Sequence, residues 1–131
     1  MPTLNYIKIY SPATIANMGP GFDCIGGAID LWNEFEFIFH PKNNKTIELK
    51  IEIKEEGENT LSVDKSNLVY KAFSIPFKLL KINVPKINIK ITNNIKLESG
   101  LGSSSSAISA GLLAANYYIN KNHGQCFNKI K

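Results

Sequence analysis

The sequence predicts an α+β fold in which helices pack on a mainly antiparallel sheet. Several segments alternate apolar and polar residues with a period of two, as half-buried strands do. Two other segments show the apolar spacing of helices. The expected order is strands, helix, strand, helix, without an internal repeat or a recognisable linker, and 131 residues fit the size of one domain.

The strands come first along the chain. Residues 6–10 are expected to form a short opening strand. In residues 34–39 three phenylalanines interleave with two glutamates, and residues 46–54 carry Ile or Leu on one face and charged side chains on the other. Residues 40–44, which contain Pro and two Asn, are typical of a hairpin connection between these two strands. Isoleucines at alternate positions in residues 87–91 predict a further strand.

The first helix is expected near the middle of the chain. Ser66 is predicted to cap a helix that runs from Asn67 towards Phe73, because a serine hydroxyl can accept a hydrogen bond from the first turn. Pro76 is expected to end or kink this helix, since proline removes a donor and clashes with the preceding turn.

A second helix is expected to begin within residues 103–106 and to continue to about Ile119. Ile108, Leu112 and Ala115 lead to Ile119 along one helical stripe. Small residues on the other faces would let the helix lie close to several neighbours. The pattern therefore predicts a buried central helix.

Composition narrows the class of protein. Hydrophobic residues make up 44% and charged residues 20% of the chain, as in soluble globular proteins. The net charge of +4 comes from scattered lysines, so a polyphosphate ligand or solubility explains it as well as nucleic acid does, and no motif interleaves basic and aromatic residues. The longest apolar stretch, residues 107–115, is short of the ~20 residues that span a bilayer, and residues 1–10 lack a signal-peptide pattern. We expect a cytoplasmic protein without a nucleic-acid or membrane partner.

A segment rich in glycine and serine, residues 99–106, lies between an expected strand and the second helix. Gly100 and Gly102 let the backbone bend and let a ligand approach the main chain. The first amides of a helix have no internal partners, and the helix dipole adds about half a positive charge there. These features predict a phosphate site, although the segment matches neither the P-loop nor the GxGxxG pattern. A plainer interpretation stays open, because serine often caps helices; four consecutive serines exceed what capping requires.

A second polar arrangement lies near the amino terminus. Gly19-Pro20-Gly21 forces a tight irregular turn, with Asn17 and Asp23 on either side of it. The amide of Asn17 could bind a hydroxyl group, and the ionised carboxylate of Asp23 could pair with an ammonium group. The pair would suit a small substrate that carries a hydroxyl and an amine. Alternatively, both side chains only satisfy amides of the turn, as Asn and Asp commonly do.

Both segments carry a family resemblance. Residues 12–23, Pro-Ala-Thr-Ile-Ala-Asn-Met-Gly-Pro-Gly-Phe-Asp, resemble the first motif of homoserine kinases. Residues 100–104, Gly-Leu-Gly-Ser-Ser, resemble the second motif shared by the GHMP kinase superfamily, in the expected order. The first motif is the more specific of the two. The resemblance implies an ATP-binding GHMP kinase amino-terminal domain over residues 1–131, with a left-handed βαβ unit and without the carboxy-terminal domain.

The resemblance also implies a set of site residues. Asn17 and Asp23 match residues that contact homoserine, the Asn near the reacting hydroxyl and the Asp near the amino group. Asn67, in a segment that resembles the lining of the adenine pocket, is implied to contact the nucleotide. The loop that wraps the ATP phosphates is implied to comprise Ser99, Gly100, Leu101, Gly102, Ser103, Ser104, Ser105 and Ser106, and Leu97 and Glu98 before it are also expected to contact the nucleotide. Apart from the resemblance, a serine hydroxyl of this loop could ligate magnesium, and Ser104 is the residue expected to do so.

The sequence departs from the family pattern in three ways. The family usually has a proline shortly before Gly-Leu-Gly, where this chain has Lys96-Leu97-Glu98-Ser99, so an acid lies near the phosphates. All 15 basic residues are lysines, so the arginines that hold the substrate carboxylate in the family are missing. The magnesium-binding glutamate and the third glycine-rich motif of the family are expected beyond residue 131.

The implied activity is the ATP- and Mg²⁺-dependent phosphorylation of the side-chain hydroxyl of L-homoserine to O-phospho-L-homoserine, a step of threonine biosynthesis. A homodimer is a further expectation for the full-length protein. No residue is assigned as a catalytic base, and Asp23 is interpreted as a binding group because phosphoryl transfer depends mostly on positioning. Two alternatives stay open: a superfamily kinase for another small alcohol, and an incomplete, non-catalytic fragment that binds nucleotide.

Overall fold

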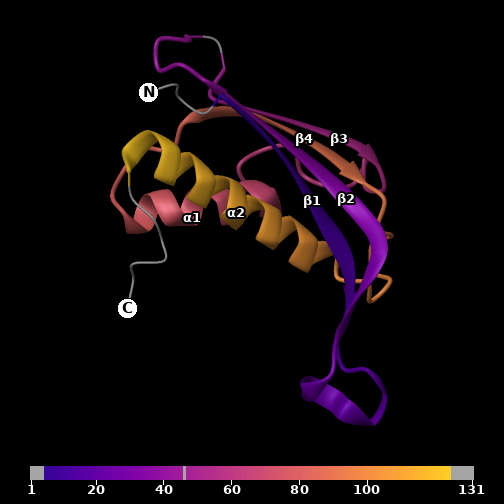
Figure 1. Ribbon diagram of the computed structural model, residues 1–131. Helices are drawn as coiled ribbons and strands as arrows, with labels where there is room; N and C mark the ends of the chain where they lie inside the picture. The colour runs from indigo at the N-terminus through magenta and orange to yellow at the C-terminus, as the bar shows by residue number, and fades with distance from the viewer. Residues whose placement is uncertain (1–4, 46, 125–131) are drawn as a thin grey trace.

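The computed structural model describes residues 5–45 and 47–124, without the side chains of residues 21–23. It shows a four-stranded mixed sheet with two helices against one face (Figure 1). This confirms the predicted α+β class. The elements in chain order are β1 (Tyr6–Ile15), the 3-10 helix η1 (Gly19–Cys24), β2 (Gly27–His40), β3 (Leu49–Glu55), α1 (Leu68–Leu79), β4 (Lys86–Asn93) and α2 (Ser103–His123).

The strands lie in the order β1-β2-β4-β3. The pairs β1–β2 and β2–β4 are antiparallel, whereas β3 and β4 are parallel and are joined through α1 as a βαβ unit. The predicted hairpin at residues 40–44 is therefore wrong, because β4 lies between β2 and β3. The left-handed sense expected for the βαβ unit stays a prediction.

The inner face of the sheet explains why β4 takes the central place. Ile89 of β4 pairs with Phe37 of β2 on one side and with Ile51 of β3 on the other. The next row repeats the pattern with Ile91, Phe35 and Ile53. All six side chains belong to the buried core. Cross-strand apolar pairs stabilise a sheet, and this order buries the isoleucines of β4 on both flanks.

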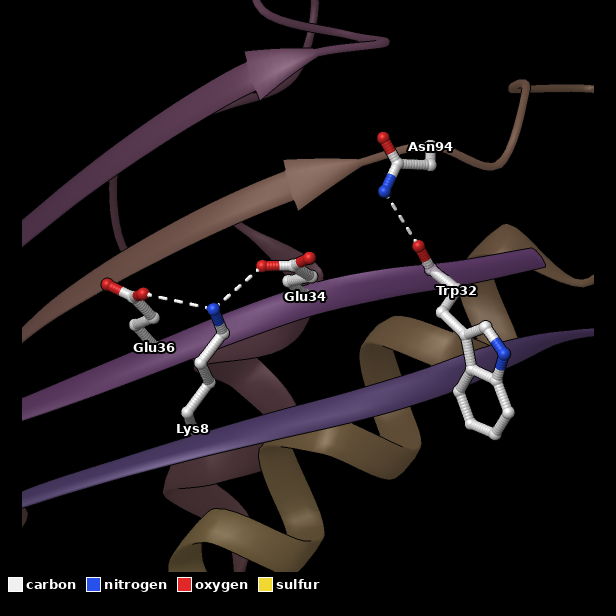
Figure 2. Close-up of polar contacts among 5 residues, drawn as sticks. All are labelled: Lys8, Trp32, Glu34, Glu36 and Asn94. Atoms are coloured by element: carbon white, nitrogen blue, oxygen red, sulfur yellow. Dashed lines mark hydrogen bonds and ion pairs between the residues drawn. The ribbon is translucent and has the colours of Figure 1, made fainter. Parts of the chain in front are cut away.

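The outer face of the sheet is polar, as the period of two predicts. Lys8, Glu36, Lys90 and Glu52 form one row of alternating charge across all four strands. Figure 2 shows the Lys8 ammonium between two carboxylates, 2.9 Å from Glu34 and 3.6 Å from Glu36. The hydrogen bond with Glu34 raises the pKa of Lys8. The helices therefore cover only one face of the sheet.

Strands β1 and β2 extend further than the alternation of apolar residues predicts. Their register shifts between Pro12 and Ala13, and pairing then continues to Ile15 and Gly27. Beyond that point the chain forms an arm that contains η1 and projects past the end of the sheet (Figure 1). The added part of β1, residues 11–15, is mostly small or polar, and the added part of β2, residues 27–33, has Ile29, Leu31 and Trp32 without a sustained alternation.

Helix α1 differs from the prediction at both ends. Its N-cap is Asn67, whose side-chain oxygen accepts a hydrogen bond from the Val69 amide at 2.9 Å, and not Ser66. Pro76 lies inside the helix and does not end it. The amide of Leu80 still donates to the Pro76 carbonyl at 3.1 Å, and Phe77 is fully buried. Packing against the sheet therefore outweighs the donor that the proline removes.

Helix α2 is buried through its small residues. Ala110, Gly111, Ala114 and Ala115 are buried, whereas Ile108 and Leu112 of the predicted stripe are each 40% exposed. A Cβ on Gly111 would lie 2.5 Å from the Val69 carbonyl oxygen, so the missing side chain sets how closely α2 approaches α1. The predicted buried helix is therefore buried along its small residues and at Ile119, and not along the whole of the predicted stripe. In the described residues, no helix combines the length and the apolar character that a membrane crossing requires.

Candidate functional site

The glycine-rich segment forms the loop that leads into α2. Gly100 and Gly102 have φ angles of 74° and 73°, in the left-handed region that glycine tolerates best. Gly102 is the N-cap of α2. A Cβ on Gly100 would meet nothing within 4 Å, so the main chain there borders open space. A ligand can therefore reach the backbone of this loop.

The start of α2 offers free hydrogen-bond donors. Ser106 is the first residue whose amide donates back into the helix, to the Gly102 carbonyl at 2.9 Å. The amides of Ser103, Ser104 and Ser105 precede it and have no carbonyl of their own helix to bond. No acidic residue occupies the first turn, so the positive end of the helix dipole is not offset by an acid there. These amides suit an anion, phosphate above all.

Two hollows meet at this helix start. One has a volume of about 220 Å³ and lies between α1, α2 and the core of the sheet. Its lining is part apolar and part polar: Phe35, Leu61, Ser62, Ser66, Asn67, Leu68, Val69, Ile91, Asn93, Leu97, Ser103, Ser104 and Ala107. The other, of about 400 Å³, is lined by residues 96–104 and Leu61. Ser103 and Ser104 line both hollows, so a half-apolar pocket opens directly onto the free amides at the start of α2.

The buried side chain of Asn33 and the exposed side chain of Asn94 hold the connection from β4 to this loop. The side-chain oxygen of Asn33, which is 1% exposed, accepts hydrogen bonds from the amides of Asn94 at 2.7 Å and Ile95 at 2.9 Å. Asn94 in turn donates to the Trp32 carbonyl at 2.8 Å, as Figure 2 shows. The entry to the loop is therefore fixed to β2.

The loop itself carries most of the predicted nucleotide-binding residues. The amide of Leu97 donates to the Glu56 carboxylate at 3.3 Å, and the Ser99 hydroxyl donates to the Lys96 carbonyl at 2.6 Å. Glu98 is exposed and has a φ angle of 55°. All residues from Leu97 to Ser104 line one hollow, and Ser105 lies next to them at the helix start.

Ser106 and Asn67, both predicted to contact the nucleotide, make hydrogen bonds within the protein. Ser106 is 2% exposed, and its hydroxyl donates to the Ser11 carbonyl at 3.4 Å. Asn67 lines the smaller hollow, but besides capping α1 its side-chain amide donates to the Ser62 carbonyl at 2.7 Å. Contacts of Ser106 and Asn67 with a nucleotide stay predictions. The structure gives both side chains a positioning role.

The segment before Asn67 is also ordered by its own side chains. The carboxylate of Asp64 accepts a hydrogen bond from the Ser66 amide at 2.8 Å and another from the Ser66 hydroxyl. These bonds to the hydroxyl and the amide lower the pKa of Asp64. The turn that borders the smaller hollow is thus held by local hydrogen bonds.

The amino-terminal motif lies on the projecting arm. Asn17 is exposed and has a φ angle of 58°, which asparagine tolerates better than most residues. Asp23 belongs to η1, and its side chain lies outside the described residues. Asn17 does not line either of the two hollows at the helix start. The structure therefore does not bring Asn17 into the glycine-rich loop.

The arm nevertheless begins beside that loop. The amide of Thr14 donates to the Leu101 carbonyl at 2.9 Å. Three residues span at most about 11 Å, so the backbone of Asn17 lies within that distance of Thr14. Sequence reasoning missed the hydrogen bonds that Thr14 and Asn33 make with the glycine-rich loop and its entry. The sequence does indicate a special role for Asn33, because it is a polar residue on the face that Phe35, Phe37 and Phe39 continue.

The chain is similar to known proteins. Residues 67–126 match the family model described as the GHMP kinases N terminal domain. A homoserine kinase of Trichodesmium erythraeum (strain IMS101) is 41% identical over 116 residues, which cover 88% of this chain and 37% of that protein. The homoserine kinase of Carboxydothermus hydrogenoformans is 43% identical over 113 residues, covering 86% and 36%.

Solved structures agree with these matches. A homoserine kinase from Cytophaga hutchinsonii has a TM-score of 0.71 at 28% identity, covering 100% of this chain and 38% of that one. The Methanococcus jannaschii mevalonate kinase, with a TM-score of 0.66 at 20% identity over 92% of this chain and 43% of that one, shows the shared fold alone. The chain spans a little over a third of the length of the curated relatives it matches. Residues 67–126 therefore match the GHMP kinase amino-terminal domain, and the chain is similar in sequence and in fold to the amino-terminal part of homoserine kinases.

Proposed function

We propose that the chain is the amino-terminal part of a homoserine kinase. This enzyme transfers the γ-phosphoryl group of ATP to the side-chain hydroxyl of L-homoserine and forms O-phospho-L-homoserine. One observation carries the proposal: the free amides at the start of α2 open onto a half-apolar hollow, in a chain 41% identical to a homoserine kinase over 116 residues.

The nucleotide would lie across the two hollows. The amides of Ser103, Ser104 and Ser105 would donate to phosphate oxygens, and Gly100 would let the phosphates approach the main chain. The adenosine would enter the hollow of about 220 Å³, between Leu61 and the turn before α1. Phosphoryl transfer depends mainly on such positioning and charge neutralisation.

Magnesium belongs to the proposal as the partner of ATP. Among the described residues, no group of three or more His, Cys, Asp or Glu could hold a metal ion. The serine hydroxyls of the loop fit an ion that takes most of its ligands from the nucleotide and water. The Ser104 hydroxyl would be one protein ligand. When bound, Mg²⁺ would neutralise phosphate charge.

The substrate would be held by the arm. Asn17 would bind the reacting hydroxyl and Asp23 the ammonium group of L-homoserine. An amide and a carboxylate, placed on an arm that starts near the phosphate loop, would align the hydroxyl with the γ-phosphate. The isolated 131-residue chain is proposed to bind nucleotide without catalysing transfer. A superfamily kinase for another small alcohol is the alternative that substrate screening would reveal.

The test is coupled ADP release with Mg-ATP and L-homoserine, in a version extended to the length of the relatives. We expect activity that depends on L-homoserine, and Asp23→Ala should raise the KM for homoserine at least about tenfold, with a smaller change for ATP, because a charge-assisted bond is lost. Asp30→Ala is the matched control, since Asp30 is an exposed residue that bonds the Trp32 indole at 2.7 Å. An unchanged homoserine KM in Asp23→Ala would remove the role given to Asp23.

A further inference from the structure

Thr14 contacts the phosphate loop through both its backbone and its side chain. β1 is an edge strand of the sheet, and the Thr14 amide donates to the Leu101 carbonyl at 2.9 Å. The loop thus pairs with a strand edge that would otherwise present this donor to solvent. The register shift between Pro12 and Ala13 immediately precedes Thr14.

The side chain of Thr14 fits against Gly102. A Cβ built on Gly102 would lie 2.1 Å from the Thr14 hydroxyl oxygen and 3.2 Å from the Thr14 carbonyl oxygen. The hydroxyl oxygen therefore occupies the space that any side chain at Gly102 would need. Gly102 is also the N-cap of α2, so this contact fixes the start of the helix itself.

A second contact ties the same turn to β1. The Ser106 hydroxyl donates to the Ser11 carbonyl at 3.4 Å, and the Ser106 amide donates to the Gly102 carbonyl at 2.9 Å. The first turn of α2 is therefore held to β1 at both of its ends. The amides of Ser103, Ser104 and Ser105 lie between these two attachments.

We propose that Thr14 is a positioning residue that sets the place of the phosphate-binding amides relative to the substrate-binding arm. The arm begins three residues later at Asn17, so one strand carries both the loop contact and the proposed homoserine contact. Any shift of the loop from Thr14 changes the distance between the bound phosphates and the bound hydroxyl. The inference rests on the proposed function for its kinetic consequence, whereas the loop contact itself can be tested without it.

Three variants of the extended protein test this role. Thr14→Ser keeps the oxygen against Gly102 and should retain kcat within about twofold. Thr14→Ala leaves a gap, and Thr14→Val places a larger methyl group where the oxygen lies. Both should lower kcat by about 10- to 100-fold, because a misplacement of about 1 Å can cost that much, with smaller changes in either KM. Thr92→Ala is the matched control, since Thr92 pairs with Glu34 and Lys54 on the outer face of the sheet.

Hydrogen exchange of the ligand-free protein gives the second readout. Undocking of the loop should speed exchange at the hydrogen-bonded amides of Thr14 and Ser106 by at least about tenfold in Thr14→Ala and Thr14→Val, but not in Thr14→Ser or Thr92→Ala. Wild-type exchange with wild-type kcat in Thr14→Ala would overturn the inference, as would a loss of thermal stability alone. If the unsubstituted protein shows no activity that depends on L-homoserine, the proposed function fails and the exchange data still decide the role of Thr14.

Discussion

Asparagine side chains hold the connections that surround the candidate site. Asn67 caps α1 and bonds the Ser62 carbonyl, and Asn33 accepts two amides just before the glycine-rich loop. Asn93 donates to the Glu56 carbonyl at 2.9 Å. An amide side chain offers both a donor and an acceptor, so each of these residues can satisfy backbone groups that no strand or helix pairs. These asparagine side chains therefore stabilise the backbone around the candidate site.

Asn33→Ala should destabilise the protein more than the loss of so few side-chain atoms suggests. The change removes one acceptor and leaves the part-buried amide of residue 94 and the buried amide of residue 95 without it, which we expect to cost about 2–4 kcal/mol in the free energy of unfolding. Urea denaturation monitored by circular dichroism measures this cost.

Asn94→Ala is the control for that experiment. It removes an exposed side-chain donor to the Trp32 carbonyl and should cost less than about 1 kcal/mol. Equal effects of the two substitutions would show that the double acceptor of Asn33 does not hold the loop entry.

At the scale of elements, the close packing of α2 against α1 depends on Gly111. Gly111→Ala should destabilise the protein by about 1–3 kcal/mol, because the new Cβ would lie 2.5 Å from the Val69 carbonyl oxygen and 2.9 Å from the Ala72 Cβ. Alanine alone would favour the helix by about 1 kcal/mol over glycine, so the expected sign is opposite to that of helix propensity.

Ser109→Ala gives the comparison for Gly111→Ala, since Ser109 lies on an exposed face of the same helix. There the higher propensity of alanine should leave stability unchanged or slightly raised. Thermal unfolding of both variants measures the difference. A Gly111→Ala protein as stable as the original would contradict the close approach of α1 and α2.

The elements were predicted more fully than their arrangement. Alternation identified the cores of the strands, because those residues have one apolar and one polar face. Pairing is set by contacts between distant segments, so the place of β4 between β2 and β3 was not visible in any local pattern. The start of α1 was missed by one residue, since Ser66 and Asn67 are both good caps and only the fold decides between them.

The candidate site was likewise predicted only where it depends on local sequence. The loop from Gly100 to Ser105 was predicted from local chemistry, because glycines and a helix start make an anion site wherever they occur together. Thr14 could not be identified as a contact of Gly102, since that contact joins residues far apart in the sequence. The roles of Asn17 and Asp23 stay predictions.

At the scale of the whole molecule, the helices leave an apolar surface uncovered. Ile75, Leu79, Leu112 and Leu113 are 48%, 66%, 40% and 43% exposed. They line a hollow of about 420 Å³ between α1 and α2, on the outer side of the helices. Clustered exposed apolar groups favour association.

The 131-residue chain should therefore self-associate as its concentration rises. The double variant Leu79→Lys and Leu112→Lys should lower the association constant at least about tenfold, since it removes the apolar area that association would bury and places two charges in the contact. Sedimentation velocity over a concentration series measures this change. Val63→Lys is the control, because Val63 is 56% exposed outside this surface. Association that persists unchanged in the double variant would show that another surface is responsible.

The central claim is that nucleotide binds where the loop meets α2, and amide NMR of the 131-residue chain with added Mg-ATP tests it most directly. We predict saturable shifts at the amides of Ser103, Ser104 and Ser105 and around the hollow of about 220 Å³ near Leu61 and Leu97. Shifts confined to the basic hollow around Lys42, Lys81 and His123, or no saturable shift at the loop, would contradict the account.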